Sequence, residues 1–255
     1  MSYTRYDSLK GRAVIVTGGA SGIGAAFVRG FAANAARVAF LDVQDAAGAA
    51  LAEEIGASAD PAPLFVRCDL TDVTALRAAL ADVRAALGPA AVLVNNAAND
   101  QRHEFAALTP EEFDATIAVN LRHVLFAAQA VVPQMQELGY GSIINMSSVA
   151  WMRGIPGLET YAAAKAAIVG FTNSLARRVG PYRIRVNAIA PGMVLTERQR
   201  RLWFQDESLV EAGRANQFLP DLIAPEDIAN LALFLASDDS RLITKQTISV
   251  NAGVL

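Results

Sequence analysis

The sequence is poor in the residues that build disulfides and metal sites. Its 255 residues include one cysteine, Cys68, and two histidines. A single thiol cannot form an intramolecular disulfide, so the fold needs no oxidising compartment. A structural zinc site takes about four cysteine or histidine ligands, and we therefore expect no metal site.

Long apolar runs and basic runs are also missing. No stretch reaches the ~18 consecutive apolar residues of a membrane span, and the charged N-terminal segment contains no apolar signal-peptide core. The net charge is −3, from 22 basic and 25 acidic side chains, and the basic residues do not cluster. We therefore expect a cytoplasmic protein that binds neither membranes nor nucleic acids.

The chain does have many apolar residues, 53% of the total, arranged in short runs that alternate with helical patterns. Strands that are apolar throughout are typical of a parallel sheet covered on both faces, and alternation with helices indicates right-handed βαβ units. The sequence therefore predicts an α/β protein of the Rossmann type, doubly wound, with a mostly parallel seven-stranded sheet and helices on both faces. The predicted strands are 13–17, 37–41, 64–67, 91–94, 142–145, 183–189 and 247–250.

Helical patterns occupy the segments between these strands. We expect Pro133 to kink or end the long helix that follows Pro110. With no linker or repeat, residues 1–255 are predicted to form a single domain. Residues 193–223 are irregular, and we interpret them either as a substrate lid with short helices inside or as a surface excursion packed on a partner subunit. The other predicted helices are 22–34, 46–55, 71–87, 161–179 and 225–236.

A glycine-rich turn joins the first predicted strand to the first helix, with the sequence Thr17-Gly18-Gly19-Ala20-Ser21-Gly22-Ile23-Gly24. Helix N-termini attract anions, and glycines let a pyrophosphate approach the backbone closely. The spacing differs from the common G-x-G-x-x-G fingerprint, but the strand–turn–helix context favours a dinucleotide site over an ordinary turn.

Asp42 stands at the end of the second predicted strand, twenty residues after Gly22. A carboxylate there can accept hydrogen bonds from the adenosine ribose hydroxyls, and it would repel a 2′-phosphate. No basic residue lies between Gly18 and Ala26 or in 43–45 to offset that charge. The position predicts NAD rather than NADP; the alternative is a surface aspartate that begins the next helix.

Tyr161 and Lys165 are one helical turn apart and so share a face of a predicted helix. Ser148 precedes Tyr161 by thirteen residues, just past the fifth predicted strand, where ligands bind in open α/β sheets. The same spacing in Tyr6 and Lys10 has no such context. Tyr161 and Lys165 could instead be surface residues of an amphipathic helix.

The grouping suits the oxidation of an alcohol, in which a nicotinamide takes the hydride and a base takes the proton. A free tyrosine has a pKa near 10, and the neighbouring Lys165 ammonium together with the positive nicotinamide ring is expected to lower the pKa of Tyr161. Ser148 would hold the substrate oxygen. Asn120 interrupts an apolar helical stripe, and its amide either binds a water that leads a proton from Lys165 or is bound by neighbouring backbone.

Together these residues resemble the short-chain dehydrogenase/reductase family over nearly the whole chain. The resemblance implies an Asn, Ser, Tyr and Lys tetrad at Asn120, Ser148, Tyr161 and Lys165, and it implies a homotetramer. The Asn-Asn-Ala-Gly stretch of the family corresponds to residues 95–98, with alanine in place of the final glycine. The implied cofactor contacts are Gly18, Ser21, Gly22, Ile23, Gly24, Asp42, Asp69, Leu70, Asn96, Ala97, Tyr161, Lys165, Pro191, Gly192, Val194 and Thr196.

Residues 97–103 and 147–151 resemble the branch of the family that oxidises aldoses at C1. We expect four residues to contact the sugar: Ser148, Tyr161, Asn99 and Trp151. Asn99 and Trp151 follow the ends of the fourth and fifth predicted strands and could supply the polar partners and the aromatic face that a sugar needs. We expect His103 to be a capping or structural residue and His123 to lie on a helix surface. Ordinary packing or solvation is the alternative for the further candidates Gln101, Arg198, Arg200, Trp203 and Phe204.

The sequence therefore predicts an NAD-dependent oxidation of an aldose at C1 to the aldonolactone. One alternative is a reductase of 3-oxoacyl thioesters, or another alcohol or ketone oxidoreductase of the same family. The thioester reductases usually use NADPH and a basic surface, which Asp42 and the net charge disfavour. Another is a non-catalytic, cofactor-sensing binding protein, which typically lacks the tyrosine or the lysine. The sugar, its anomer and the strictness for NAD stay open.

Overall fold

A computed structural model describes residues 3–254, so residues 1, 2 and 255 of the predicted domain lie outside it. Its seven strands form one parallel sheet in the order β3-β2-β1-β4-β5-β6-β7, which confirms the predicted doubly wound arrangement. The strands are β1 (Ala13–Thr17), β2 (Arg37–Asp42), β3 (Leu64–Arg67), β4 (Val92–Asn95), β5 (Gly141–Met146), β6 (Ile184–Pro191) and β7 (Thr247–Val250).

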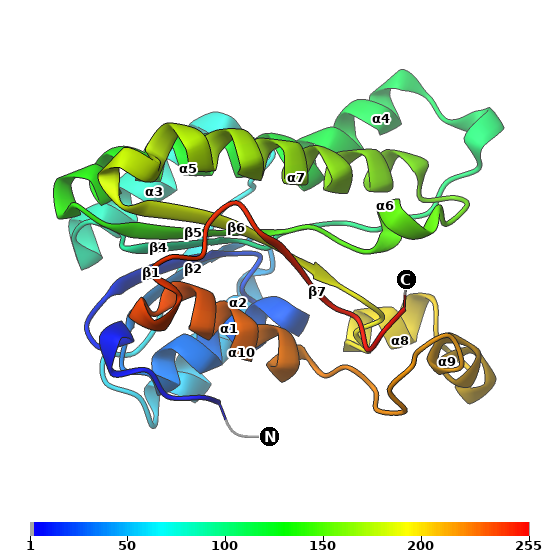
Figure 1. Ribbon diagram of the computed structural model, residues 1–255, viewed down its shortest axis with the longest axis horizontal. Coiled ribbons are helices and arrows are strands. Elements are labelled where there is room, and N and C mark those ends of the chain that lie inside the picture. Colours follow the sequence, from blue (N-terminus) through cyan, green and yellow to red (C-terminus); the bar gives the residue numbers. More distant parts are fainter. Residues whose placement is uncertain (1–2, 255) are drawn as a thin grey trace.

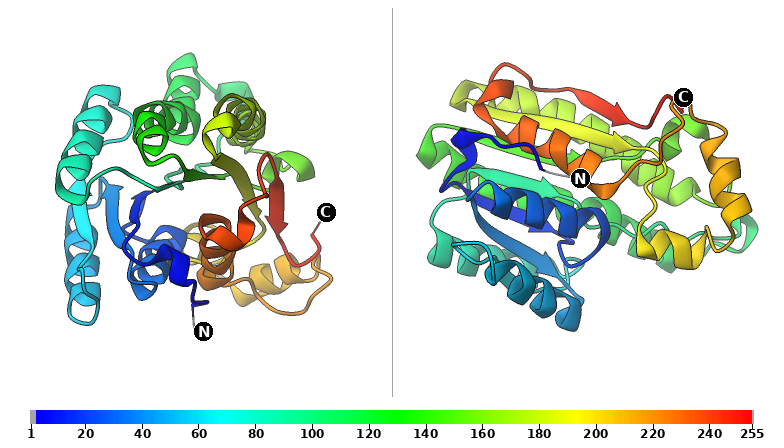
Figure 2. Two further views of the ribbon diagram at one scale, coloured as in Figure 1. Left: turned by 60° about the vertical axis from the view of Figure 1, so that its left-hand side comes forward. Right: turned by 90° about the horizontal axis from the view of Figure 1, so that it is seen from below.

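Helices cover both faces of the sheet. Figure 1 shows α1, α2 and α10 below the sheet and α3, α5 and α7 above it, and the end-on view in Figure 2 shows the same layers. The helices of these layers are α1 (Gly22–Ala33), α2 (Asp45–Gly56), α3 (Val73–Leu87), α5 (His123–Leu138), α7 (Glu159–Val179) and α10 (Pro225–Ala236).

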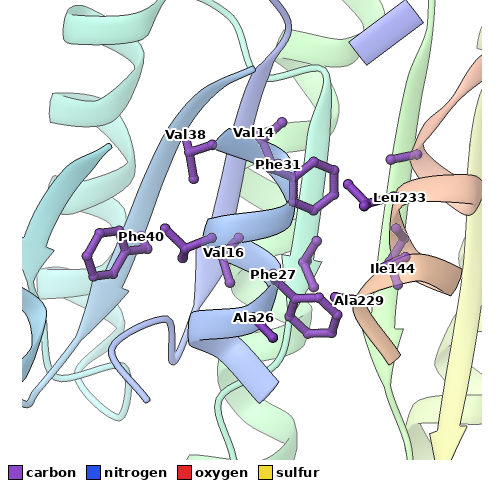
Figure 3. Packing of buried hydrophobic residues seen from close by; sticks show 14 of the residues in the cluster. Val14, Val16, Ala26, Phe27, Phe31, Val38, Phe40, Ile144, Ala229 and Leu233 are labelled. Atoms are coloured by element: carbon purple, nitrogen blue, oxygen red, sulfur yellow. The ribbon is translucent and has the colours of Figure 1, made fainter. Parts of the chain in front are cut away.

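Large apolar side chains anchor α1 on the sheet. Phe27 and Phe31 are fully buried, one turn apart on α1, and Figure 3 shows them between β1 and the residues Ala229 and Leu233 of α10. Burying one such side chain contributes about 1.5–3 kcal/mol. This packing fixes the N-terminus of α1 at the carboxyl end of β1.

The long helix after Pro110 contains a turn that the sequence did not predict, and it continues past Pro133, where a kink or an end was expected. It comprises α4 (Pro110–Ile117), a π-helical turn at Ala118–Arg122 and α5. It does not end at Pro133 but continues to Leu138. A proline removes one backbone hydrogen bond, and the buried side chains around it, including Val131 and Met135, hold this part of the helix on the sheet.

Residues 110–138 are also long and apolar enough to cross a membrane by length and composition alone. The sequence contains no uninterrupted apolar run there, since Arg122 and His123 stand in its middle. In the structure this helix packs on α3, β4 and β5. We therefore treat it as one helix of the upper layer.

The segment 193–223 contains the short helices α8 (Glu197–Leu202) and α9 (Glu207–Arg214), as the sequence predicts. A single parallel bridge between Val194 and Ile223 joins its two ends. Both helices lie at the carboxyl end of the sheet, on the right of Figure 1, and the short helix α6 (Ala150–Arg153) lies above them in that view. Ligands bind at this edge of open α/β sheets, where the strand order reverses between β1 and β4.

Candidate functional site

A cleft of about 1120 Å³ lies at the carboxyl ends of the strands. Its walls include every residue that the sequence predicted to bind the cofactor, together with Ser148 and Asn99. Two predicted site residues, Asn120 and Trp151, are not among the residues that line it. Polar side chains from distant parts of the chain therefore meet in one cleft, with the glycine-rich turn at its floor.

The glycine-rich turn is packed too tightly for side chains at three positions, Gly18, Gly19 and Gly24. A Cβ atom on Gly24 would lie 1.8 Å from the carbonyl oxygen of Gly18. A Cβ atom on Gly18 would lie 2.6 Å from the Cα of Ala97, and Gly18 also has a positive φ of 66°. The start of α1 thus packs directly against the turn, and the turn lines the cleft, which fits a dinucleotide pyrophosphate held by helix N-terminal amides.

Asp42 is buried and holds the glycine-rich turn, so it is not the surface residue of the alternative interpretation. Its Oδ2 accepts a hydrogen bond from the Ala20 amide at 2.9 Å, and its Oδ1 accepts one from the Gln44 amide at 3.0 Å. The Gln44 side-chain amide also donates to Asp42 and to Ser21 Oγ, each at 3.2 Å. The carboxylate still lines the cleft, where a ribose could reach it.

The turn after β4 is tied to the end of β1. The Asn96 amide group donates to the carbonyl oxygens of Thr17 and Gly18 at 3.1 and 2.8 Å, while Thr17 Oγ1 accepts from the backbone of Asn96 and Ala97. Asp69 closes its own turn, accepting from Thr71 Oγ1 at 2.7 Å, and this bond lowers the pKa of its carboxyl. Hydrogen bonds thus connect the ends of β1 and β4 beside the glycine-rich turn.

Ser148, Tyr161 and Lys165 come together in the cleft wall, as the sequence predicts. The Lys165 Nζ lies 5.5 Å from the centre of the Tyr161 ring and donates to the Met146 carbonyl at 2.8 Å. Ser147 Oγ donates to the Lys165 carbonyl at 2.8 Å, which fixes α7 beside the end of β5. Tyr6 and Lys10, which have the same spacing, do not line the cleft, and Lys10 is exposed.

The pKa values differ from the expectation of an acidified tyrosine. Burial raises the pKa of Tyr161, the Asp100 carboxylate raises it further, and a hydrogen bond with Ser148 opposes this only in part. Burial lowers the pKa of Lys165 to about 7, against the opposing attraction of Asp100. In the protein without its cofactor, burial and Asp100 therefore dominate the pKa of Tyr161. The predicted lowering also depends on the positive nicotinamide ring, and it stays a prediction.

Asn120 lies on the π-helical turn, and neighbouring backbone binds its amide. Its Oδ1 accepts from the Asn99 amide at 2.9 Å, and its Nδ2 donates to the carbonyls of Asn99 and Thr116, each at 3.0 Å. This is the alternative that the sequence left open. Asn120 thus fixes the loop after β4, while a water path from Lys165 stays a prediction.

The prediction of a surface position for His123 was wrong. Its side chain is fully buried, and its Nε2 lies 3.1 Å from the Ala97 carbonyl, to which it donates. The π-helical turn immediately before it adds a residue to the turn and rotates the following residues by about 100° relative to a regular helix. His103 has a structural contact as expected, with its Nε2 3.2 Å from Glu159 Oε2.

The burial of His123 predicts a loss of stability in acid. Burial and the nearby Lys165 lower the pKa of His123 from 6.5 to about 4, and the carbonyls of Ala97 and Val119 offset this only in part. Because the unfolded chain takes up the proton first as the pH falls from 6.5 to 4, unfolding should become easier by on the order of 3 kcal/mol. Urea unfolding across this window should show the loss.

The matched variant for that measurement is His123→Gln, which keeps a donor but does not titrate. Carboxyl groups with lowered pKa values, such as Asp69, contribute equally to both proteins. Stabilisation linked to Lys165 changes only between pH 10.5 and about 7, above this window. The stability difference between the two proteins should therefore follow His123 alone, and a flat difference curve would contradict its buried neutral state.

Sequence reasoning missed Asp100 as a site residue. Asp100 lies in the loop after β4, where its Oδ1 accepts from Arg198 Nη2 at 3.1 Å and its Oδ2 accepts from Gln199 Nε2 at 2.6 Å. Arg198 also donates to Asn99 Oδ1 at 2.7 Å. The one sequence signal for Asp100 was its position after a predicted strand, and Asn99 and Gln101 share that position.

Trp151 does not provide the aromatic face of the cleft that the sequence predicted. Trp151 stands on α6, whose cleft-lining residues are Ala150 and Arg153. Residues one apart on a helix point about 100° apart, which turns Trp151 away when those two face the cleft. Trp203 and Phe204 do line it, and the Arg102 guanidinium lies 4.4 Å from the Trp203 ring centre. Of the further polar candidates, Arg198 lines the cleft, whereas Gln101 and Arg200 do not.

Comparison with known proteins supports an oxidoreductase. A family model described as enoyl-(acyl carrier protein) reductase matches residues 18–255. The chain is 47% identical to a probable galactose dehydrogenase of Rhizobium meliloti over 98% of both chains, and 46% identical to a D-xylose 1-dehydrogenase of Caulobacter vibrioides over 99% of both. A crystal structure of a 3-oxoacyl (acyl-carrier-protein) reductase from Agrobacterium tumefaciens with NADP bound is 31% identical, with a TM-score of 0.90 over 97% of this chain and 96% of that one.

Proposed function

Because the chain belongs to the short-chain dehydrogenase/reductase family, whose members use a nicotinamide cofactor, we propose that it oxidises an aldose at C1 with NAD and releases the aldonolactone. The relatives named as galactose and D-xylose dehydrogenases support a sugar substrate. The observation that carries the proposal is that Ser148, Tyr161 and Lys165 line the same cleft as the glycine-rich turn. An assay of NADH formation across pentoses, hexoses and deoxyhexoses tests it, and no turnover with any aldose would contradict it.

In this mechanism Ser148 Oγ holds the O1 hydroxyl of the cyclic sugar, and the Tyr161 oxygen accepts its proton. As the O1–H bond breaks, the C1–O1 bond becomes a carbonyl and C1 loses a hydride. The nicotinamide supplies the hydride acceptor when it is bound. Lys165 lies beside the Tyr161 ring and favours the phenolate electrostatically whenever its own amine is protonated. Near its pKa of about 7, it can also pass a proton onward.

The preference for NAD over NADP should be roughly 30-fold or more in kcat/KM, because a carboxylate beside a 2′-phosphate costs about 2 kcal/mol or more at an effective dielectric of ~20. Arg29, the basic residue at that end of the cleft, is already paired with Glu54 at 2.8 Å. Asp42→Asn keeps an oxygen for the Ala20 amide but removes the charge. It should narrow the preference, and a wild-type protein that favours NADP would overturn the assignment.

The thioester reductase alternative has specific support, since the solved structure is named as a 3-oxoacyl (acyl-carrier-protein) reductase and the family model as an enoyl-(acyl carrier protein) reductase. Asp42 argues against it, because in the proposed binding mode its buried carboxylate would lie beside the 2′-phosphate of NADP, where a cation would be needed. Acetoacetyl thioesters assayed with NADPH beside the sugar panel decide between the two. The binding-protein alternative requires a defective centre, whereas this cleft contains both Tyr161 and Lys165.

We also propose that residues 1–255 act as a single cytoplasmic domain, that 193–223 close over the substrate, and that four copies assemble. The position of α8 beside the cleft supports the lid. Light scattering of the purified protein tests the tetramer, and limited proteolysis with and without NAD tests the closure of the segment.

A further inference from the structure

Asp100 occupies an unusual position for a carboxylate in this cleft. Its side chain is 20% exposed and lines the cavity that contains Tyr161 and Lys165. Both of its side-chain partners, Arg198 and Gln199, come from α8, almost a hundred residues further along the chain. Each partner binds a different oxygen, so the plane of the carboxylate is fixed.

The negative charge of Asp100 has a cost at the reacting centre. It raises the pKa of Tyr161, which disfavours the phenolate that the proposed reaction needs. The ion pair with Arg198 accounts for part of this charge, but Arg198 also donates to Asn99 Oδ1 at 2.7 Å and is shared between the two side chains. The carboxylate therefore keeps the capacity to bind a further hydrogen-bond donor in the cleft.

A carboxylate has about four acceptor positions, and the described protein contacts occupy two of them, one on each oxygen. The part of the group that lines the cleft can accept hydrogen bonds from adjacent hydroxyls. A sugar has such hydroxyls beside C1, whereas a 3-oxoacyl chain has none. Asn99, the neighbouring candidate, is less free, because its Oδ1 already accepts from Arg198 and from the Gln101 amide.

We propose that Asp100 determines the specificity of this site for polyhydroxylated substrates, by accepting hydrogen bonds from sugar hydroxyls near C1 while Arg198 and Gln199 hold its carboxylate in place. The inference rests on the proposed function and deepens it. It assigns the recognition of the sugar ring to the loop after β4, with α8 as the support of that loop.

The test is an Asp100→Asn variant assayed on the best aldose and on its 2-, 3- and 4-deoxy analogues. Hydrogen bonds to a charged group predict a loss of roughly 10- to 100-fold in kcat/KM on the parent sugar. On the analogue that lacks the recognised hydroxyl, the wild type should already be slow and the substitution should cost little more. Asp82→Asn, an exposed position on α3, is the matched control and should leave all rates unchanged.

NAD binding and thermal unfolding of each variant separate recognition from folding. If the amide destabilises the loop, Asp100→Glu keeps the charge but moves it by one methylene, and it should change the ranking of the deoxy analogues. An equal loss on every analogue would make Asp100 a support of α8 only and would overturn the inference while leaving the proposed function intact. Absence of wild-type turnover with any aldose would overturn both, and it would be visible before any variant is compared.

Discussion

Replacement of Tyr161 by phenylalanine should lower kcat by roughly 100- to 10,000-fold, the contribution typical of a positioned general base. The variant removes one oxygen and keeps the ring beside Lys165. No other group in the proposed mechanism accepts the O1 proton, because Ser148 only holds the hydroxyl. Steady-state NADH formation with the best aldose measures the loss.

NAD affinity should change little in this variant, because most predicted cofactor contacts lie on the glycine-rich turn and the strand ends. A fluorescence titration with NADH checks this. Tyr182→Phe, at an exposed tyrosine after α7, is the matched control and should retain full activity. A Tyr161→Phe protein with near-normal kcat would refute the mechanism, whereas lost NAD binding would show damage to the cleft rather than to the base.

The sheet could be predicted from the sequence because its strands are buried on both faces. β1 is buried at all five positions, so it forms an uninterrupted apolar run that no surface element shares. The turn at Gly18 and the pair Tyr161 and Lys165 could also be predicted from the sequence. Their short-range spacing places the turn at the carboxyl edge of the sheet and the pair on one face of a helix. Local pattern and tertiary structure agree at these positions.

The wrong and missing predictions concern residues whose surroundings depend on tertiary structure rather than on local pattern. His123 was misplaced because a π-helical turn changes the phase of the helix, and a regular helical wheel contains no sign of it. Asp100 was missed because its partners stand 98 and 99 residues further along the chain. The pKa of Tyr161 in the protein alone depends on burial and on Asp100, and neither can be inferred from the spacing of Tyr161 and Lys165.

The substitution Gly24→Ala should disable cofactor binding more severely than its single methyl group suggests. The new Cβ would lie 1.8 Å from the Gly18 carbonyl oxygen and 2.8 Å from the Asn96 amide nitrogen, which itself donates to that carbonyl at 2.8 Å. The start of α1 must therefore move away from the turn. Losing two hydrogen bonds to a charged pyrophosphate, at about 1.5 kcal/mol each, raises the Kd for NAD by roughly 100-fold.

The same collision should lower stability, since overpacking costs about 1–3 kcal/mol, or about 2–10 °C in Tm for a chain of this length. Gly170→Ala is the matched control, because Gly170 is exposed on α7 and has open space where a Cβ would be. That variant should bind NAD normally and gain about 0.5–1 kcal/mol from reduced chain entropy. Calorimetric titration and thermal unfolding of both variants distinguish the effects. If Gly24→Ala binds NAD as tightly as Gly170→Ala, the pyrophosphate does not lie on this turn, because a turn displaced by a Cβ at that distance could not keep the same amides on the ligand.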